Sequence, residues 1–198
     1  MDDIYASLRR AAVGYLGGVG LAIPAGLILG WYATIRAFFE PWIQFLRSIP
    51  SLALIPLVII ILGIGSTPKY LIIGLAAFLA TLIATYQGVI NLDPSYINAA
   101  RVLGAREGTI FLKVVIPATS PYILVGARIA IGNAWGTLVA AELISSRSGL
   151  GYMTQEGSLY FNVPEMYVSI IFIGLLGFLM DRIVYLFQQR ATRWQERR

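Results

Sequence analysis

The stretch NAARVLGAREGTIFLKVVIP, residues 98–117, is a polar and charged interruption between two long apolar runs. Residues 91–95 just before it supply helix-start chemistry, and residues 99–103 favour a short helix that Gly104 can end. Such a helix is too short and too charged to span a bilayer, so we expect it at the membrane surface. Its chemistry leaves two interpretations open: an ordinary hydrated loop, or a docking element that another protein approaches closely over two adjacent alanines.

The composition places the chain in a membrane. Apolar residues make up 58% of the 198 residues and charged residues only 13%, and the apolar residues lie in long uncharged runs. With no cysteine and no histidine, disulfides, thiolate metal sites and histidine acid–base chemistry are excluded. The sequence also has no P-loop and no metal-ligand cluster, so we expect no catalytic residue, no metal site and no ATPase activity in this chain. The net charge of +5 fits basic membrane loops better than nucleic-acid binding.

Five apolar segments predict membrane-spanning structure. They are residues 11–35, residues 51–68, residues 70–92, a run that begins at Val114, and a last span with its core at residues 166–180. Prolines and glycines interrupt the second segment, so we expect a short or irregular helix there. In the first segment, Gly14 and Gly18, and again Gly26 and Gly30, are four residues apart, a spacing that lets helix backbones pack closely. We expect these glycines to contact another helix of the same chain rather than another subunit.

The distribution of basic residues predicts the orientation. Residues 36–50 combine charged and aromatic side chains, which is typical of an amphipathic link lying on the membrane surface. If this link, the stretch at 98–117 and the C-terminal tail lie on one side, that side holds ten lysines and arginines and the other side holds four. The positive-inside rule then places the stretch and the C-terminus in the cytoplasm. The ten are Arg36, Arg47, Arg101, Arg106, Lys113, Arg182, Arg190, Arg193, Arg197 and Arg198, and the four are Arg9, Arg10, Lys69 and Arg147.

Two charged residues lie within the fourth apolar run or near its end. Arg128 is inside it, where a charge costs about 2.5–3.5 kcal/mol at a helix centre, so we expect it to face a partner or a watery pathway. It can help an anion through a pore, or form a structural pair with a carboxylate or with helix-end carbonyls. Glu142 is fourteen residues further on, about 21 Å along a helix, so the two can pair only if the helix breaks. We expect Glu142 near the outer surface, before a polar connection in which Ser148 and Gly149 can shape a gate or form a plain loop.

The stretch at 98–117 resembles the signature loop of the membrane subunits of binding-protein-dependent ABC transporters. That loop runs Glu-Ala-Ala, three residues, Gly, nine residues, then Ile-x-Leu-Pro, and this sequence keeps both gaps, with conservative changes at Val114 and Ile116. One departure is Asn98, where the family usually has Glu. Because Asn can cap a helix but carries no charge, we expect coupling to rely less on an ion pair at this position.

The likeness extends beyond the loop, from about residue 7 to residue 182. Residues 48–65, SIPSLALIPLVIIILGIG, resemble the branch of these permeases that handles nitrate, sulfonates, taurine or bicarbonate. Residues 148–152, SGLGY, resemble the external segment of the family. Family members usually carry an additional N-terminal span, so we expect this chain to be a short relative or part of a longer one.

By this resemblance the chain is an all-α importer permease of type I, with about five transmembrane helices and a cytoplasmic coupling helix. A transmembrane domain would cover residues 7–182 and a basic cytoplasmic tail residues 183–198. The resemblance implies a homodimer in the inner membrane of a prokaryote, with two cytoplasmic ATPase subunits that hold ATP and Mg²⁺ and an external substrate-binding protein. The implied ATPase-coupling residues are Asn98, Ala99, Ala100, Leu103, Gly104, Ala105 and Pro117, and the candidates for the pathway or a gate are Arg128, Glu142, Ser148 and Gly149.

Other functions stay open at this point. The cargo of such an importer can be an oxyanion or a small organic molecule such as a vitamin precursor, because selectivity is expected to rest largely with the binding protein. A secondary transporter would need ion-coupling groups in its spans and often has inverted repeats, whereas this sequence offers Arg128 alone and no convincing repeat. A non-transporting membrane scaffold fits the composition but leaves the double-gapped motif unexplained.

Overall fold

The computed structural model describes residues 2–192, and this part of the chain is helical, with short turns between the helices. Four helices are long and apolar enough to cross a membrane, and a bent pair of helices raises the number to five. The prediction of an all-α chain with about five spans is confirmed. The four are α1 (Asp2–Trp31), α4 (Thr67–Ile90), α7 (Ile116–Ser145) with the turns that precede it, and α9 (Val163–Thr192).

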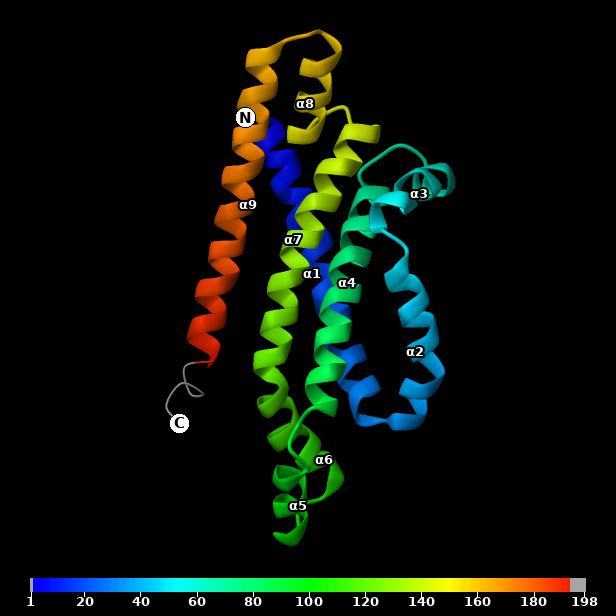
Figure 1. Ribbon diagram of the computed structural model, residues 1–198, viewed down its shortest axis with the longest axis vertical. Helices are drawn as coiled ribbons and strands as arrows, with labels where there is room; N and C mark the ends of the chain where they lie inside the picture. Colours follow the sequence, from blue (N-terminus) through cyan, green and yellow to red (C-terminus); the bar gives the residue numbers. More distant parts are fainter. Residues whose placement is uncertain (1, 193–198) are drawn as a thin grey trace.

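The centre of the molecule is the packing of α1 on α4 and of α4 on α7, which run lengthwise side by side (Figure 1). Glycines let α1 and α4 approach closely. A Cβ atom added to Gly14, Gly18, Gly26 or Gly30 would lie closer than 3.0 Å to an atom of α4. The prediction that these glycines contact another helix of the same chain is confirmed.

Most of the second apolar segment, residues 51–68, forms the second arm of a bent pair of helices. α2 (Ala33–Ser48) is followed by the 3₁₀ turn η1 (Ser51–Leu54) and by α3 (Ile55–Leu62), and the two arms meet at 85°. The predicted short, irregular helix is therefore confirmed. The prediction that residues 36–50 lie flat on the membrane surface is wrong, because α2 runs lengthwise beside α4 (Figure 1). Of its apolar side chains, Ile43 is buried against α1 and α4, whereas Phe38, Trp42 and Phe45 are exposed.

The stretch at 98–117 lies at one end of the molecule (Figure 1). It contains the predicted short helix, α5 (Pro94–Val102), and then α6 (Glu107–Ile110), which continues through the π-helical turn η2 (Phe111–Val115) into α7. The fourth span thus begins at Glu107 rather than at Val114. The wide turn immediately precedes Pro117, whose ring has no N–H to donate to an ordinary helical turn.

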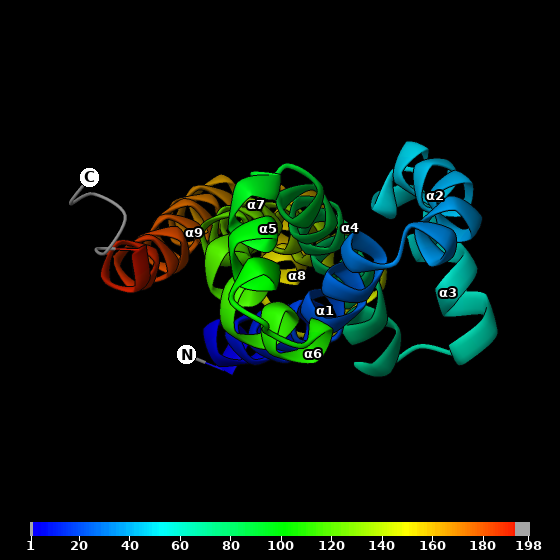
Figure 2. The ribbon, with the colours of Figure 1, turned by 90° about the horizontal axis from the view of Figure 1, so that it is seen from below.

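The remaining helices lie at the far end and at one edge. α8 (Leu150–Leu159) lies at the end opposite α5, and α9 and the α2–α3 pair form opposite edges of the bundle (Figure 2). α9 continues without a break through Thr192, past the start of the predicted tail at residue 183. Apart from Ser169 and Leu176, the described residues of α9 are exposed or half-buried, so most of its surface faces lipid or another protein. Arg193, Arg197 and Arg198 of the predicted basic tail lie outside the described residues.

Candidate functional site

α5 is fixed by hydrogen bonds at both ends. At its start the Asp93 carboxylate accepts hydrogen bonds from the hydroxyl and the backbone N–H of Ser95, at 2.6 and 2.8 Å. These bonds hold the pKa of Asp93 below its ordinary value. At its end Gly104 has φ +77°, its N–H donates to the carbonyl of Arg101 at 2.9 Å, and the next N–H donates to the carbonyl of Ala100 at 3.0 Å. This is the Schellman arrangement, so the predicted helix start and the predicted stop at Gly104 are confirmed.

The predicted coupling residues divide between two faces of this element. Ala100 and Ala105 are half-buried and pack on the apolar cluster beneath α5. The opposite face is exposed, and its two large apolar side chains, Val102 and Leu103, are 88% and 87% exposed. Isolated exposed apolar groups are normal, but two adjacent ones at the projecting end of a molecule indicate a contact surface. We call the exposed set the α5 tip: Asn98, Ala99, Val102, Leu103 and Gly104.

Contacts outside the α5 tip hold α5 and the turns that follow it to the spans. Arg101 Nε donates to Glu107 Oε1 at 3.0 Å, which ties α5 to the start of α6. The Trp31 ring at the end of α1 packs on Phe111, with centroids 5.5 Å apart. Pro117, the last predicted coupling residue, is exposed in the first turn of α7 rather than in α5. A hollow of about 350 Å³ beside the tip is lined by Trp31, Pro94, Ile97, Asn98, Arg101 and Glu107.

Three of the four predicted pathway or gate residues lie together near the opposite end of the molecule. Glu142 in α7 is only 1% exposed. Its carboxylate accepts hydrogen bonds from Arg10 Nη1 at 2.7 Å, from the Ser7 hydroxyl at 2.8 Å and from the Gly151 N–H at 3.1 Å. A carboxylate enclosed in this way binds the start of α1 to the end of α7, and it does not line an open passage.

Ser148 and Gly149 complete this network. Arg10 donates to the carbonyl and to the hydroxyl of Ser148, at 2.7 and 2.9 Å. The Gly149 N–H donates to the Asp3 carboxylate at 2.6 Å, and its φ of +118° favours glycine. The predicted connection is thus a fixed turn bonded to α1, and a gating role for it stays a prediction. Sequence reasoning missed Asp3, Ser7 and Arg10 because their partners lie more than 130 residues away in the chain.

Arg128 lies apart from this network. Its Nε and Nη2 donate to the two carboxylate oxygens of Asp181 at 2.9 and 3.0 Å, which ties α7 to α9. Its guanidinium also lies 4.7 Å from the ring centroid of Tyr185. Of the two interpretations of Arg128, the structure contains the pair with a carboxylate, and the partner is Asp181 rather than Glu142. No local pattern marks this partner, since Asp181 follows the apolar core of another helix, 53 residues away.

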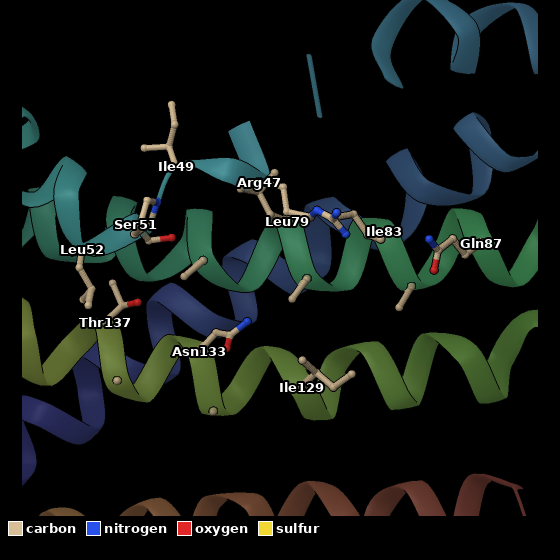
Figure 3. Close-up of a pocket in the computed structure, with 16 residues that line it drawn as sticks. Arg47, Ile49, Ser51, Leu52, Leu79, Ile83, Gln87, Ile129, Asn133 and Thr137 are labelled. Carbon is tan, nitrogen blue, oxygen red and sulfur yellow. The ribbon is translucent and has the colours of Figure 1, made fainter. Parts of the chain in front are cut away.

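A groove of about 680 Å³ lies between the end of α2, η1, α4 and α7 (Figure 3). Five polar or charged residues contribute to its wall. The distribution of basic residues predicts Arg47 at the end that carries α5. The structure places it beside the middle of α4 instead, where Figure 3 shows its guanidinium between Leu79 and Ile83. The five are Arg47, Ser51, Gln87, Asn133 and Thr137.

Sequence reasoning did not select these groove residues, and the signal available to it was weak. Arg47 is the last charge of an amphipathic helix, which does not distinguish a side chain at the membrane surface from one inside a groove. Asn133 interrupts an apolar run, and a polar amide at membrane depth indicates a partner or water. Chemically, the groove offers one cation and several neutral hydrogen-bond donors.

The chain matches the family model described as "binding-protein-dependent transport system inner membrane component" over residues 22–193. A probable ABC transporter permease protein of Brucella abortus strain 2308 is 55% identical over 197 residues, covering 100% of this chain and 79% of that protein. The taurine transport system permease protein of Escherichia coli K12 is 36% identical and covers 98% of this chain and 70% of that protein. The nitrate import permease protein of Leptolyngbya laminosa is 35% identical, and the match covers 96% of this chain and 68% of that protein.

The fold also has solved counterparts. The chain is similar to a chain of the methionine ABC transporter MetNI in an inward-facing conformation, with a TM-score of 0.83 and 19% identity over 96% of this chain and 94% of that one. At this identity the likeness concerns the fold alone. The family resemblance carried by the double-gapped motif is confirmed by the family model and by the relatives. The chain belongs to the permeases of the binding-protein-dependent ABC importers, the inner membrane components of these transport systems.

Proposed function

We propose that this chain is the permease subunit of an ATP-driven importer for a small oxyanion, such as nitrate, a sulfonate, taurine or bicarbonate. Two cytoplasmic ATPase subunits hold ATP and Mg²⁺, a second copy of this chain completes the pathway, and an external substrate-binding protein delivers the cargo. The α5 tip and the C-terminus face the cytoplasm, in line with the distribution of basic residues. The names of the taurine and nitrate relatives support the cargo class.

The α5 tip is the observation that carries this proposal. An element that transmits force from an ATPase has to be short, stiff and able to make a compact apolar contact. α5 has the Asp93 cap at one end and the Schellman turn at Gly104 at the other, and it presents Val102 and Leu103 almost fully exposed. A plain hydrated loop would need neither the two caps nor the adjacent apolar side chains.

The connection of α5 to the spans favours the same role. Arg101 bonds to Glu107, at the start of the continuous helical path α6–η2–α7. A displacement of the α5 tip should therefore also move the start of α7. α7 in turn lines the groove with Asn133 and Thr137, so motion at the tip can change the pathway.

The test is co-purification of the chain from its native membranes in mild detergent, with mass spectrometry and an ATPase assay on the product. We expect a P-loop ATPase to accompany the unmodified chain. The double variant Val102→Ser/Leu103→Ser should weaken that association at least about tenfold, because apolar anchors at the centre of a contact dominate its affinity.

The matched control is Leu159→Ser, since Leu159 is 67% exposed and is the last residue of α8, the helix at the end opposite α5 (Figure 1). It should leave ATPase recovery unchanged. Recovery of the chain without an ATPase would contradict the proposed function. Equal recovery from the double variant and the control would contradict the role of the α5 tip.

A further inference from the structure

We propose that the groove between α2, α4 and α7 is a transit site for a small oxyanion, and that Arg47 is the cation that attracts the ion. This inference rests on the function proposed above and adds the residues that would contact the cargo. It depends on four features of the groove: its depth, the unpaired charge of Arg47, the neutral donors around it, and its open space.

The groove lies at mid-length of the spans. Figure 3 places the Arg47 guanidinium next to Leu79 of α4. Leu79 is close to the midpoint of Thr67–Ile90, about 17 Å along the helix axis from either end. Because a hydrocarbon core is about 30 Å thick, a guanidinium at this level is far from both membrane surfaces if α4 spans the bilayer.

Arg47 has no partner there, in contrast to other charged groups on the spans. Glu142 and Asp181 each hold an arginine, and Lys69 donates to two backbone carbonyls at 2.9 and 3.0 Å. Within residues 2–192, the Arg47 side chain makes neither an ion pair nor a hydrogen bond. The acid on its own helix, Glu40, is seven residues earlier, about 10 Å along the axis, and does not line the groove. An arginine at this depth costs about 2.5–3.5 kcal/mol unless it meets water or an anion.

The other polar residues of the groove wall can bind an anion weakly enough to release it. Ser51 and Thr137 offer hydroxyl donors, and Gln87 and Asn133 offer amide donors. Figure 3 shows Asn133 and Thr137 pointing from α7 toward α4 and η1. Of the 16 described residues that line the groove, none is Asp or Glu, so no carboxylate there repels an anion. One cation with neutral donors binds an oxyanion without holding it permanently, as conduction requires.

The volume of the groove is large enough for a partly hydrated oxyanion. Gly132 and Gly136 share the four-residue spacing of the α1 glycines, yet a Cβ atom at either position would meet nothing within 4 Å. Their side of α7 is therefore left open instead of being packed. A volume of about 680 Å³ corresponds to about 20 water molecules at ~30 Å³ each, enough for a small oxyanion with part of its hydration shell.

The experiment uses the absence of cysteine from the chain, which allows single thiols to be placed in the full-length protein. Gly136→Cys puts a thiol in the groove without a clash, and Ser158→Cys puts one on the exposed end of α8 as a control. Labelling rates are measured in proteoliposomes with anionic sulfonatoethyl and cationic trimethylammonioethyl methanethiosulfonate. We expect Gly136→Cys to favour the anionic reagent, and Arg47→Gln to lower the anionic-to-cationic rate ratio about tenfold. Arg47→Lys should keep the preference, and the ratio at Ser158→Cys should not change.

A second experiment tests whether an oxyanion binds in the groove and protects the thiol from labelling. Sodium nitrate and sodium ethanesulfonate, each compared with sodium chloride at equal ionic strength, should slow the labelling of Gly136→Cys by neutral N-ethylmaleimide if the ion occupies the groove. The anion that protects more identifies the planar or the tetrahedral oxyanion as the better fit, and protection should be lost in Arg47→Gln. The inference is overturned if the thiol does not react at all, if Arg47→Gln leaves the rate ratio unchanged, or if neither anion protects.

ATPase co-purification of the same variants separates this inference from the proposed function. Arg47→Gln should lose protection and keep the ATPase, because Arg47 lies beside the middle of α4 and not at the end that carries α5. Arg47-dependent protection in a chain that never recovers an ATPase would support the anion site and contradict the ATP-driven importer.

Discussion

The buried pair of Arg10 and Glu142 should contribute strongly to the stability of the end of the molecule that carries α8. Glu142→Ala removes an acceptor that is bonded by three donors, Ser7, Arg10 and Gly151, and it leaves the Arg10 guanidinium without its carboxylate. The two side chains are 10% and 0% exposed, so water cannot readily replace the lost partner. Breaking a buried pair from one side costs about 3–5 kcal/mol. Because Arg10 keeps its two bonds to Ser148, we expect the lower value, about 3 kcal/mol.

An exposed ion pair in the same chain provides the comparison. Arg101 and Glu107 lie 3.0 Å apart, almost as close as the buried pair at 2.7 Å, but their side chains are 53% and 60% exposed. Pairs in water contribute about 0–1 kcal/mol. Glu107→Ala should therefore change stability little, and the contrast between the two alanine variants isolates the effect of burial.

The assay is thermal unfolding of the purified full-length chain in one detergent, followed by circular dichroism at a fixed heating rate. On the scale of globular proteins of this size, where 1 kcal/mol shifts Tm by about 2–4 °C, Glu142→Ala should lower Tm by about 6–12 °C and Glu107→Ala by at most about 4 °C. Replacing both buried partners, as in Arg10→Met/Glu142→Leu, should recover much of the loss, because no unpaired charge remains. Equal shifts for Glu142→Ala and Glu107→Ala would refute the reasoning, since they would mean that the buried pair has access to water.

Three further predictions concern two glycine positions and the helix cap Asp93. Gly149→Ala should lower Tm through strain at φ +118° and through a clash with the buried carboxylate beside it; a Tm equal to that of the unmodified chain would contradict this. Gly18→Ala should destabilise the chain because its Cβ would collide with the α4 backbone, whereas Gly17→Ala, which meets nothing within 4 Å, should be neutral or slightly stabilising in the same Tm measurement. The pKa of Asp93 is lowered by its bonds to Ser95, so its contribution to α5 is present above the ordinary value of 3.8 and is lost as pH falls through the lower folded value. Amide protection factors in α5 should fall over that acid range in the unmodified chain but not in Asp93→Asn, which caps without titrating.

The features that sequence predicted correctly depend on neighbours in the chain. Asp93 caps a helix whose first turn begins at the next residue, and Gly104 ends it through bonds that reach only a few residues back. The four α1 glycines were also predictable, because a small-residue spacing describes one face of one helix whatever that face meets. In each case the interaction that determines the structure involves residues within a few helical turns, so the local sequence pattern is enough to predict it.

The features that sequence missed depend on which helices become neighbours. Arg10 is 132 residues from Glu142 and Arg128 is 53 residues from Asp181, and nothing local marks either carboxylate as a partner. The wrong orientation of residues 36–50 has a related cause. An amphipathic pattern shows that one face of a helix is apolar. It does not show whether that face lies at the membrane surface or against a neighbouring helix.

The strength of the packing around the groove suggests how it can change width. α7 is held at one end by the buried network of Glu142 and is reached at the other end by α5 through η2. α2, which carries Arg47, is held less firmly, since Ile43 is its one buried residue in the described part of the chain. Arg47 and Asn133 thus line the same groove from a loosely packed and a firmly packed element. We expect a displacement that starts at α5 to alter the distance between these two side chains before it disturbs the α1–α4 core, because the α1 glycines hold that core in close contact.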